Sequence, residues 1–195
     1  MTFSLIAVDT ETTGLELECD VIELSLYKMN TDEVRTWCLA PLNVAAIQPE
    51  ALRINGHLLN DILHKTAEGR DRYRKPDDVI VEIENWLMED GIPSDNRVLL
   101  GHNVNFDKDM LIGLWKKCNS SGTIPFSEKY GIDTMQIEFA FDYAIGKFAE
   151  GYSLRNLAKK YGIKNEKAHS SESDTKCTVA IYREQMKVLK SLQNV

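Results

Sequence analysis

Long apolar runs, paired cysteines and low-complexity stretches are all missing from this chain of 195 residues. No apolar run approaches the ~18 residues that a membrane-spanning helix needs, so we expect no membrane partner. The 11 glycines and 5 prolines are too few for a collagen-like or linker-like protein. No basic residue precedes Asp9, which excludes a signal peptide at residues 1–8 and leaves a strand there. We expect a cytoplasmic protein with a single domain over residues 1–195.

The four cysteines, Cys19, Cys38, Cys118 and Cys177, lie far apart and form no C-x-x-C pair. Structural zinc sites need such closely spaced ligands, so this kind of metal site is not predicted. In a chain without a secretory signal, the ordinary state of a cysteine is a reduced thiol. We expect each one to be a small buried apolar side chain.

The net charge of −7 is spread unevenly along the chain. Residues 1–50 hold 2 basic and 9 acidic side chains, whereas residues 151–195 hold 9 basic and 4 acidic ones. Clustered carboxylates attract divalent cations, and a basic surface attracts phosphates. A solvated polar face would give the same counts, so charge alone leaves both interpretations open.

Hydrophobic periodicity predicts strands and helices in an alternating order. Short apolar runs predict strands over 3–8, 21–29, 34–39 and 97–100, while helical spacing appears in 76–91, 106–118, 154–161 and 173–192. Residues 119–129 form a polar loop, and 132–140 fit either the end of a strand or the start of a helix. Strands first, then helices between further strands, indicate an α/β layered domain with a mixed sheet.

Two groups of basic residues have two interpretations each. Residues 65–75 carry five basic side chains around Tyr73, either as an exposed loop that contacts a phosphate backbone or as a solvated insertion. The second group either steers a nucleic-acid strand or forms a solvated face: Lys147, Arg155, Lys159, Lys160, Lys164 and Lys167.

Carboxylates gather at the end of the first predicted strand. Asp9 and Glu11 are two positions apart, and side chains two apart on a strand share a face. Two like charges held side by side are costly unless a cation lies between them. A single D-x-E pattern is common on surfaces, so more evidence is needed to indicate a site.

Three more side chains supply that evidence. Asp107 lies in the first turn of a predicted helix directly after a strand, where its ordinary role is to pair with the helix dipole. His169 and Asp174 flank the start of the last helix, with a serine-rich stretch between them. Four carboxylates and one imidazole suit metal-dependent hydrolysis of a phosphodiester.

The order and wording of these motifs resemble the DEDDh subclass of 3′→5′ exonucleases, the family of the bacterial DNA polymerase III proofreading subunit, RNase T and oligoribonuclease. The matching segments are 9–15 (DTETTGL), 101–107 (GHNVNFD) and His169 with Asp174. Ser170 stands where the sister subclass has tyrosine, which places the chain in the histidine subclass. The resemblance implies a ribonuclease H-like exonuclease fold, with a central mixed five-stranded sheet flanked by helices.

The resemblance also implies roles for the acidic residues and the histidine. Asp9, Glu11 and Asp174 would hold a first Mg²⁺, and Asp9 would bridge to a second. Asp107 would act on the second ion through water, and His169 would be the general base. Oxygen ligands suit two Mg²⁺ ions, with Mn²⁺ as a substitute.

Further residues are implied to bind the substrate. The turn that follows the first strand would receive the 3′-terminal nucleotide. Glu50 lies in a Pro-Glu-Ala stretch that the proofreading subunit also has, and Asn55 stands where that subunit has a histidine. Leu15 and Phe106 either contact the nucleotide or simply pack in the protein. The full set of substrate-binding candidates is Thr10, Thr12, Thr13, Gly14, Leu15, Glu50, Asn55, Asn103 and Phe106.

The first hypothesis is an exonuclease that removes nucleoside 5′-monophosphates from the 3′ end of single-stranded or frayed DNA, as in proofreading during replication or repair. The second is an exoribonuclease with the same chemistry, since recognition of the 2′-hydroxyl separates RNA from DNA. The third is a noncatalytic module that binds nucleic acid or a polymerase. A polymerase partner is possible, but no long tethering tail follows Asp174, and the oligomeric state stays open.

Overall fold

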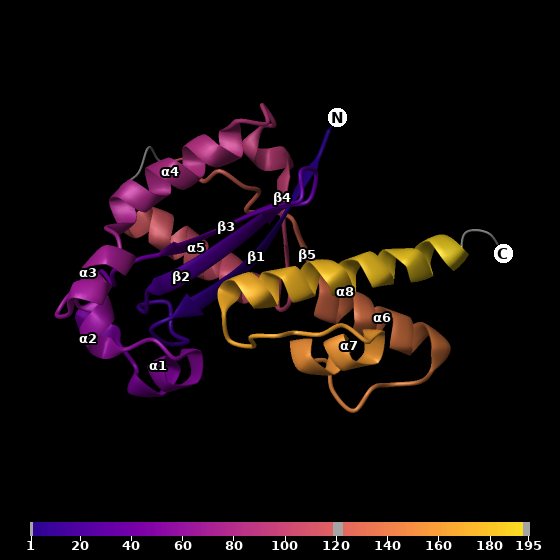
Figure 1. Cartoon of the computed structure of the whole chain (residues 1–195). Coiled ribbons are helices and arrows are strands. Elements are labelled where there is room, and N and C mark those ends of the chain that lie inside the picture. Colours follow the sequence, from indigo (N-terminus) through magenta and orange to yellow (C-terminus); the bar gives the residue numbers. More distant parts are fainter. Residues whose placement is uncertain (1, 119–122, 193–195) are drawn as a thin grey trace.

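The computed structural model describes residues 2–118 and 123–192, and it contains one mixed five-stranded sheet with helices on both faces (Figure 1). The strand order is β3-β2-β1-β4-β5. β1 pairs antiparallel with β2 and parallel with β4. At the two edges of the sheet, β3 pairs antiparallel with β2, and β5 pairs parallel with β4. The predicted fold class is confirmed. The strands are β1 (Ser4–Thr12), β2 (Val21–Lys28), β3 (Glu33–Cys38), β4 (Arg97–Gly101) and β5 (Gly131–Asp133).

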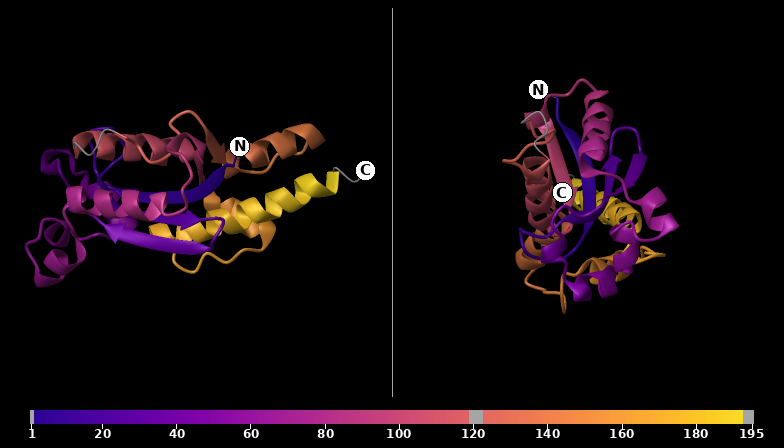
Figure 2. Two further views of the ribbon diagram at one scale, coloured as in Figure 1. Left: turned by 90° about the horizontal axis from the view of Figure 1, so that it is seen from above. Right: turned by 90° about the vertical axis from the view of Figure 1, so that its left-hand side faces the viewer.

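The helices fall into two layers, as Figure 2 shows from two further directions. α4 (Pro76–Met88) and α5 (Val104–Lys117) pack on one face of the sheet, and α8 (Ser171–Leu192) packs on the other. α6 (Thr134–Ile145) and α7 (Leu154–Tyr161) lie against α8. The short helices α1 (Pro49–Asn55), α2 (Leu59–Ile62) and α3 (Ala67–Arg72), with the 3-10 turns Val44–Ala46 and Ser94–Asn96, fill the connections.

Strand β1 shows why the two layers form. Ile6 and Val8 belong to the large core cluster with α4 and α5, whereas Ala7 belongs to the cluster that contains Val179 of α8. Alternate side chains of a strand point to opposite faces, so the residue two positions after Ala7 faces the same helix layer as Ala7 does. Asp9 therefore faces the α8 layer.

Most predicted elements are present with small shifts in their ends. Residues 132–140 contain both the predicted strand end and the predicted helix start, because β5 ends at Asp133 and α6 begins at Thr134. Asp133 caps α6 by accepting a hydrogen bond from the Met135 N–H at 2.9 Å. The predicted helix over 154–161 is confirmed, with Ser153 as its N-cap. Part of the predicted 119–129 loop lies outside the described residues.

The loop predicted over the basic segment 65–75 is wrong, whereas its five basic residues are exposed, as a solvated insertion would have them, and contact with a phosphate backbone stays a prediction. Residues 67–72 form α3 rather than a loop, and Tyr73 is 1% exposed in a core cluster. Arg72 donates to Glu23 at 2.9 Å, and Arg74 donates to Glu82 at 2.6 Å. The aromatic ring anchors the segment in the core, and Arg72 and Arg74 beside it pair with the protein's own carboxylates.

The cysteines and the lengths of the helices bear on the predictions of reduced thiols and of no membrane span. All four cysteines carry free thiols; Cys19, Cys118 and Cys177 are buried, and Cys38 is partly exposed. Within the described parts of the chain, every helix is too short or too polar to cross a lipid bilayer.

Candidate active site

The site lies where two parallel strands separate. The pairing of β1 with β4 ends at Ala7 and Leu100, but β1 continues to Thr12. The backbone N–H of Thr10, beyond the last β4 partner, donates to Asp107 Oδ1 at 2.9 Å, and the Thr10 hydroxyl donates to the same oxygen at 2.8 Å. The carboxyl end of a parallel strand at such a separation point is the usual place for a ligand in an open α/β sheet.

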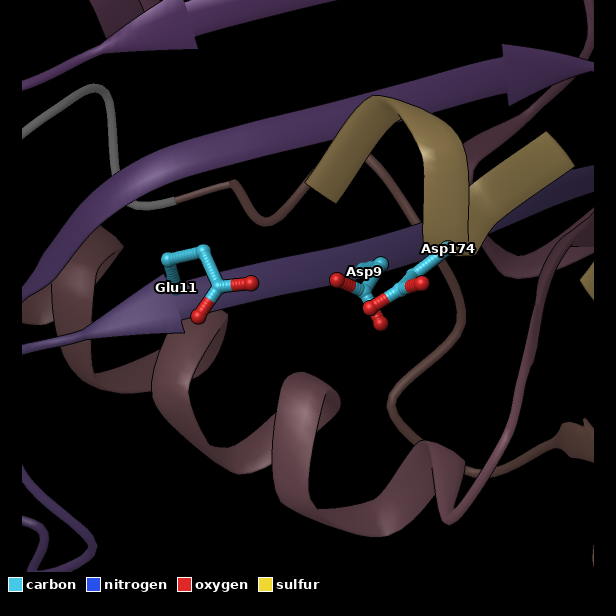
Figure 3. A group of neighbouring side chains, drawn as sticks. All are labelled: Asp9, Glu11 and Asp174. Carbon is cyan, nitrogen blue, oxygen red and sulfur yellow. The ribbon is translucent and has the colours of Figure 1, made fainter. Parts of the chain in front are cut away.

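Three carboxylates meet on the α8 side of this opening. Asp9 and Glu11 share the face of Ala7, and the first turn of α8 brings Asp174 against them. One oxygen from each of the three side chains lies within 4.8 Å of the other two. Figure 3 shows the carboxylates of Asp9 and Asp174 side by side, with Glu11 further along β1.

Crowding of negative charge makes these acids hard to ionise. Burial raises the pKa of Asp9 well above its usual range, and the charges of Asp107, Asp174, Glu11 and Glu23 raise it further. Burial and the neighbouring Asp174 raise the pKa of Glu11 to about 8. Carboxylates this close release their protons readily only when a cation offsets their charge.

The donors fit a hard divalent cation. All three side chains present oxygen atoms, and the described residues place no cysteine or histidine among them. Oxygen-only donor sets favour Mg²⁺ and Mn²⁺ over zinc. The raised pKa of Asp9 and Glu11 gives the same indication, because a divalent cation would replace the protons that the site otherwise retains.

Asp107 reaches the opening from the other layer. Burial raises its pKa to about 7, although the two hydrogen bonds from Thr10 oppose that shift. It lies outside the group of three, but its charge is the strongest of those that act on Asp9. The structure thus brings Asp107 next to the site, with one oxygen already bound to Thr10.

We expect the metal-free protein to lose stability as the pH rises from 6.5 to 8. Unfolded carboxyls titrate near ~4, whereas folded Glu11 titrates at about 8 and Asp107 at about 7. The folded state therefore holds protons that the unfolded state lacks, and stability falls as the pH rises through these values. The melting temperature should drop by about 5–10 °C.

Differential scanning calorimetry in a chelator, at the two pH values, measures this drop. The matched variant Glu11→Gln should show a smaller drop, and Mn²⁺ should raise the melting temperature most at pH 8. An equal drop in both proteins would contradict the assignment of the pH dependence to Glu11.

Asn165 is a site residue that the sequence analysis missed. Its Nδ2 donates to Asp174 Oδ1, and its Oδ1 accepts from the Ser173 hydroxyl at 2.7 Å. The backbone N–H of His169 donates to the other oxygen of Asp174, Oδ2, at 3.1 Å. Asn165 lies nine residues before Asp174 in an irregular segment, and no periodic pattern in the sequence could have indicated this contact.

Glu23 is a second missed residue, and it connects β2 to the start of α8. Its Oε1 accepts from both the backbone N–H and the hydroxyl of Ser171, at 3.0 and 2.9 Å. Its other oxygen pairs with Arg72 and lies 3.6 Å from His57 Nε2. Burial favours the neutral form, but the bonds from Ser171 and the charges of His57 and Arg72 lower the pKa of Glu23 overall. A glutamate inside the apolar strand 21–28 was the available sequence signal.

The structure places His169 beside the group of carboxylates but not in it. Its side chain is exposed and lines a cavity of about 330 Å³ together with Asn55, His57 and Arg72. Its backbone has φ +64°, and Asn103 before α5 has φ +65°. Left-handed backbone is uncommon outside glycine and gathers at functional sites.

The turn after β1 uses most of its side chains internally. The Thr12 hydroxyl donates to the Gly14 carbonyl at 2.7 Å, and the Thr13 hydroxyl accepts from the Asp20 N–H at 2.8 Å. A Cβ on Gly14 would clash with Gln48 and Cys19, so this position requires glycine for packing. Together with the Thr10 bonds to Asp107, these contacts engage the threonine hydroxyls within the protein.

The other substrate-binding candidates differ in exposure. Leu15 is 75% exposed, whereas Phe106 is partly buried against the large core cluster. Asn55 donates to the Thr12 carbonyl at 3.1 Å and so lies beside the turn. Glu50 is exposed and pairs with Arg53, and Asn103 is exposed with its N–H donated to Asp133.

A mixed sheet in this strand order, with carboxylates at the end of its first strand, agrees with the ribonuclease H-like fold that the resemblance implies. The family model described as RNase_T, exonuclease, matches residues 6–182. The chain therefore belongs to the RNase_T exonuclease family.

Similar proteins agree with this family. DNA polymerase III subunit epsilon of Treponema pallidum is 27% identical over 182 residues, which cover 90% of this chain and 73% of that protein. DNA polymerase III PolC-type of Staphylococcus saprophyticus is 24% identical over 98% of this chain. The chain spans only 12% of the length of that polymerase.

Solved structures match the fold. The complex of E. coli ExoI with single-stranded DNA has a TM-score of 0.74 at 18% identity, and it covers 100% of this chain and 43% of that one. Cell-death related nuclease 4 has a TM-score of 0.73 at 16% identity, over 96% of this chain and 64% of that one. These matches confirm the ribonuclease H-like exonuclease fold.

Proposed function

We propose that this chain is a metal-dependent 3′→5′ exonuclease that removes nucleoside 5′-monophosphates from single-stranded or frayed DNA ends. The meeting of Asp9, Glu11 and Asp174 within 4.8 Å, in a chain of the RNase_T exonuclease family, carries this proposal. Retention of all the acidic residues speaks against a noncatalytic module, because such a module has no use for so costly a cluster of charge.

In this proposal, one divalent cation would be held by Asp9, Glu11 and Asp174, and a second would be served by Asp9 and Asp107. Two Mg²⁺ ions would neutralise charge on the reacting phosphate and orient the attacking water. The raised pKa of Asp9 means that the site must lose protons before it binds a cation, so metal affinity should increase with pH.

The chain's own residues handle the substrate and a proton. The imidazole of His169 accepts a proton from the water that attacks the last phosphodiester phosphorus. The bond from phosphorus to the 3′ oxygen of the preceding nucleotide breaks, and that oxygen takes up a proton. One nucleoside 5′-monophosphate leaves, and the shortened strand ends in a 3′-hydroxyl. The exposed side chain of His169, on a loop tied to Asp174 by its N–H, suits this role.

The end of the substrate would rest on the turn after β1. Exposed Leu15 would lie against the terminal base, and its backbone N–H would face the terminal 3′-hydroxyl. Asn55, held against Thr12, and Glu50 lie on the helix next to this turn. The preference for DNA rests on the similarity to polymerase III epsilon and PolC-type sequences.

A degradation ladder tests the proposal. DNA and RNA oligonucleotides of the same sequence, labelled at the 5′ end, are incubated with the protein and Mg²⁺ or Mn²⁺. We expect a ladder of products shortened one nucleotide at a time from DNA, and no products in a chelator. Faster shortening of RNA would replace DNA with RNA as the substrate, and failure on both polymers with either cation would overturn the proposal.

We expect Asn165→Ala to weaken Mn²⁺ binding by about 10-fold, because residues that orient a metal ligand contribute on this scale. Isothermal titration calorimetry at pH 8 measures the affinity. Asn156→Ala is a matched control, since Asn156 bonds only within its own turn, to Ser153 and Gly151. Equal affinities for the two variants would show that Asn165 does not position Asp174.

A further inference from the structure

Four aromatic side chains follow one another along α6 and the segment that leads to α7. Tyr152 lies 5.5 Å from Phe139 between ring centroids, Phe139 lies 5.8 Å from Phe148, and Phe148 lies 6.4 Å from Tyr143. We call these four residues the aromatic row. In Figure 1, α6, α7 and the segment between them lie together below α8.

Three rings of the aromatic row lie at the surface, and the fourth, Tyr152, is partly buried against the core cluster of α7 and α8. Phe139 is 45% exposed, Phe148 is 56% exposed and Tyr143 is 71% exposed, and Ile145 beside them is exposed as well. Burial of these rings would stabilise the fold, so their exposure has a cost that packing does not explain. A contiguous exposed apolar patch on a folded protein marks an interaction site.

Positive charge accompanies the aromatic row. A cavity of about 510 Å³ beside Phe148 is lined also by Lys147, Lys159 and Lys160. Lys160 is neutralised by Glu138 and Asp142, but within the described residues Lys147 and Lys159 have no ion-pair partner. The cavity's other acid, Glu150, offsets one of these two charges.

Helix α7 adds to this charge because none of its residues is acidic. The helix, which forms one wall of the cavity, contributes Arg155 as well as its two lysines. The surface beside the aromatic row therefore holds four basic side chains against the three acids Glu138, Asp142 and Glu150, and its net charge is +1 in a protein whose net charge is −7.

The aromatic row begins next to the candidate active site. The ring of His102 lies at the carboxyl end of β4, with its Nδ1 2.9 Å from the Thr134 hydroxyl. Thr134 is the first residue of α6, so the end of β4 beside the site meets the start of this helix, and the aromatic row extends from there along α6.

We infer that the aromatic row and the adjacent lysines bind the single-stranded nucleic acid that leads into the active site, upstream of its 3′ end. This inference rests on the proposed exonuclease function and adds the path of the strand. Aromatic rings stack on bases of any sequence, and free lysines neutralise phosphates, which is how strands are held without sequence preference. A protein partner would leave the unpaired lysines and the continuity with the site unexplained.

The test compares binding of a long and a short strand. Oligothymidylates of 4 and 16 nucleotides, labelled at the 5′ end, are titrated with protein in a chelator and followed by fluorescence anisotropy. We expect wild type to bind the longer strand at least about 10-fold more tightly. Tyr143→Ala and Phe148→Ala should each weaken binding of the longer strand by about 5- to 30-fold and leave the shorter strand unchanged.

Salt dependence tests the lysines separately. The double variant with Lys147→Gln and Lys159→Gln should reduce the slope of log affinity against log salt for the longer strand by about 1.4, since each phosphate contact on a single strand contributes about 0.7.

Tyr130→Ala is the matched control for the ring variants in the anisotropy experiment, because Tyr130 is an exposed aromatic outside the row.

Several outcomes would overturn the inference. One is unchanged binding of the longer strand in both ring variants. Another is a dimeric wild type that becomes monomeric in the ring variants, as seen by gel filtration, because the row would then be an interface between copies of the chain. Hydrolysis of the p-nitrophenyl ester of thymidine 5′-monophosphate with Mn²⁺ tests the active site alone. Absence of this hydrolysis in wild type would count against the proposed function, whereas the comparison of strands in a chelator still tests the surface.

Discussion

The variant Asp9→Asn should lose at least about 1,000-fold in kcat, which is the scale seen when an essential catalytic carboxylate is removed. Asp9 lies against Glu11 and Asp174, and it is the group on which the charges of all the neighbouring acids converge. The amide keeps the shape of the side chain but cannot replace a charged oxygen ligand. Single-turnover cleavage of a 5′-labelled oligonucleotide with Mg²⁺ measures the loss.

The same variant should fold, because the substitution removes repulsion instead of a buried contact. Its melting temperature in a chelator at pH 8 should equal or exceed that of wild type. Asp109→Asn provides the control, since Asp109 is an exposed acid on α5, two residues after Asp107. Activity of Asp9→Asn within about 10-fold of wild type would be incompatible with a cation held by this carboxylate.

The variant His169→Ala should lose about 100- to 10,000-fold in kcat while Mn²⁺ binding is retained, because a general base contributes on this scale and His169 is not among the grouped carboxylates. Added imidazole should restore part of the rate in the variant, because it can replace the missing proton acceptor. Steady-state kinetics with and without imidazole measures both effects.

Glu166→Gln controls for disturbance of the loop, because Glu166 is exposed and lies three residues before His169. This control should keep the wild-type rate. Loss of activity in His169→Ala together with loss of Mn²⁺ affinity would show a structural role for the residue. In that case another group would accept the proton.

The order of strands and helices followed from periodicity because each element buries one apolar side. Ile6, Val8 and Ala7 alternate between two cores, and the spacing of apolar residues in 79–87 and 106–118 marks helices that cover one face. Asp9 and Glu11 could likewise be placed on one face from their spacing alone. Asp107 and Asp174 were found because each follows a strand or opens a helix.

Contacts between distant segments could not be read in this way. Asn165 reaches Asp174 across an irregular loop, and Glu23 on β2 accepts from Ser171, which is 148 positions away in sequence. The segment 65–75 looked like a basic loop, yet Tyr73 anchors it in the core. Burial of a ring and pairing of a charge depend on residues from distant segments, which the local sequence pattern does not specify.

By itself, the sequence determined the sheet, the acidic residues and the chemistry that they suit, because strand alternation and the cost of adjacent charges act over a few positions. Only the tertiary structure decided that β1 and β4 separate after Ala7 and Leu100, that three carboxylates meet there while the ring of His169 stays outside, and that aromatic side chains lead away from the opening. These features arise from the packing of whole elements against one another, which fixes where side chains distant in the chain converge.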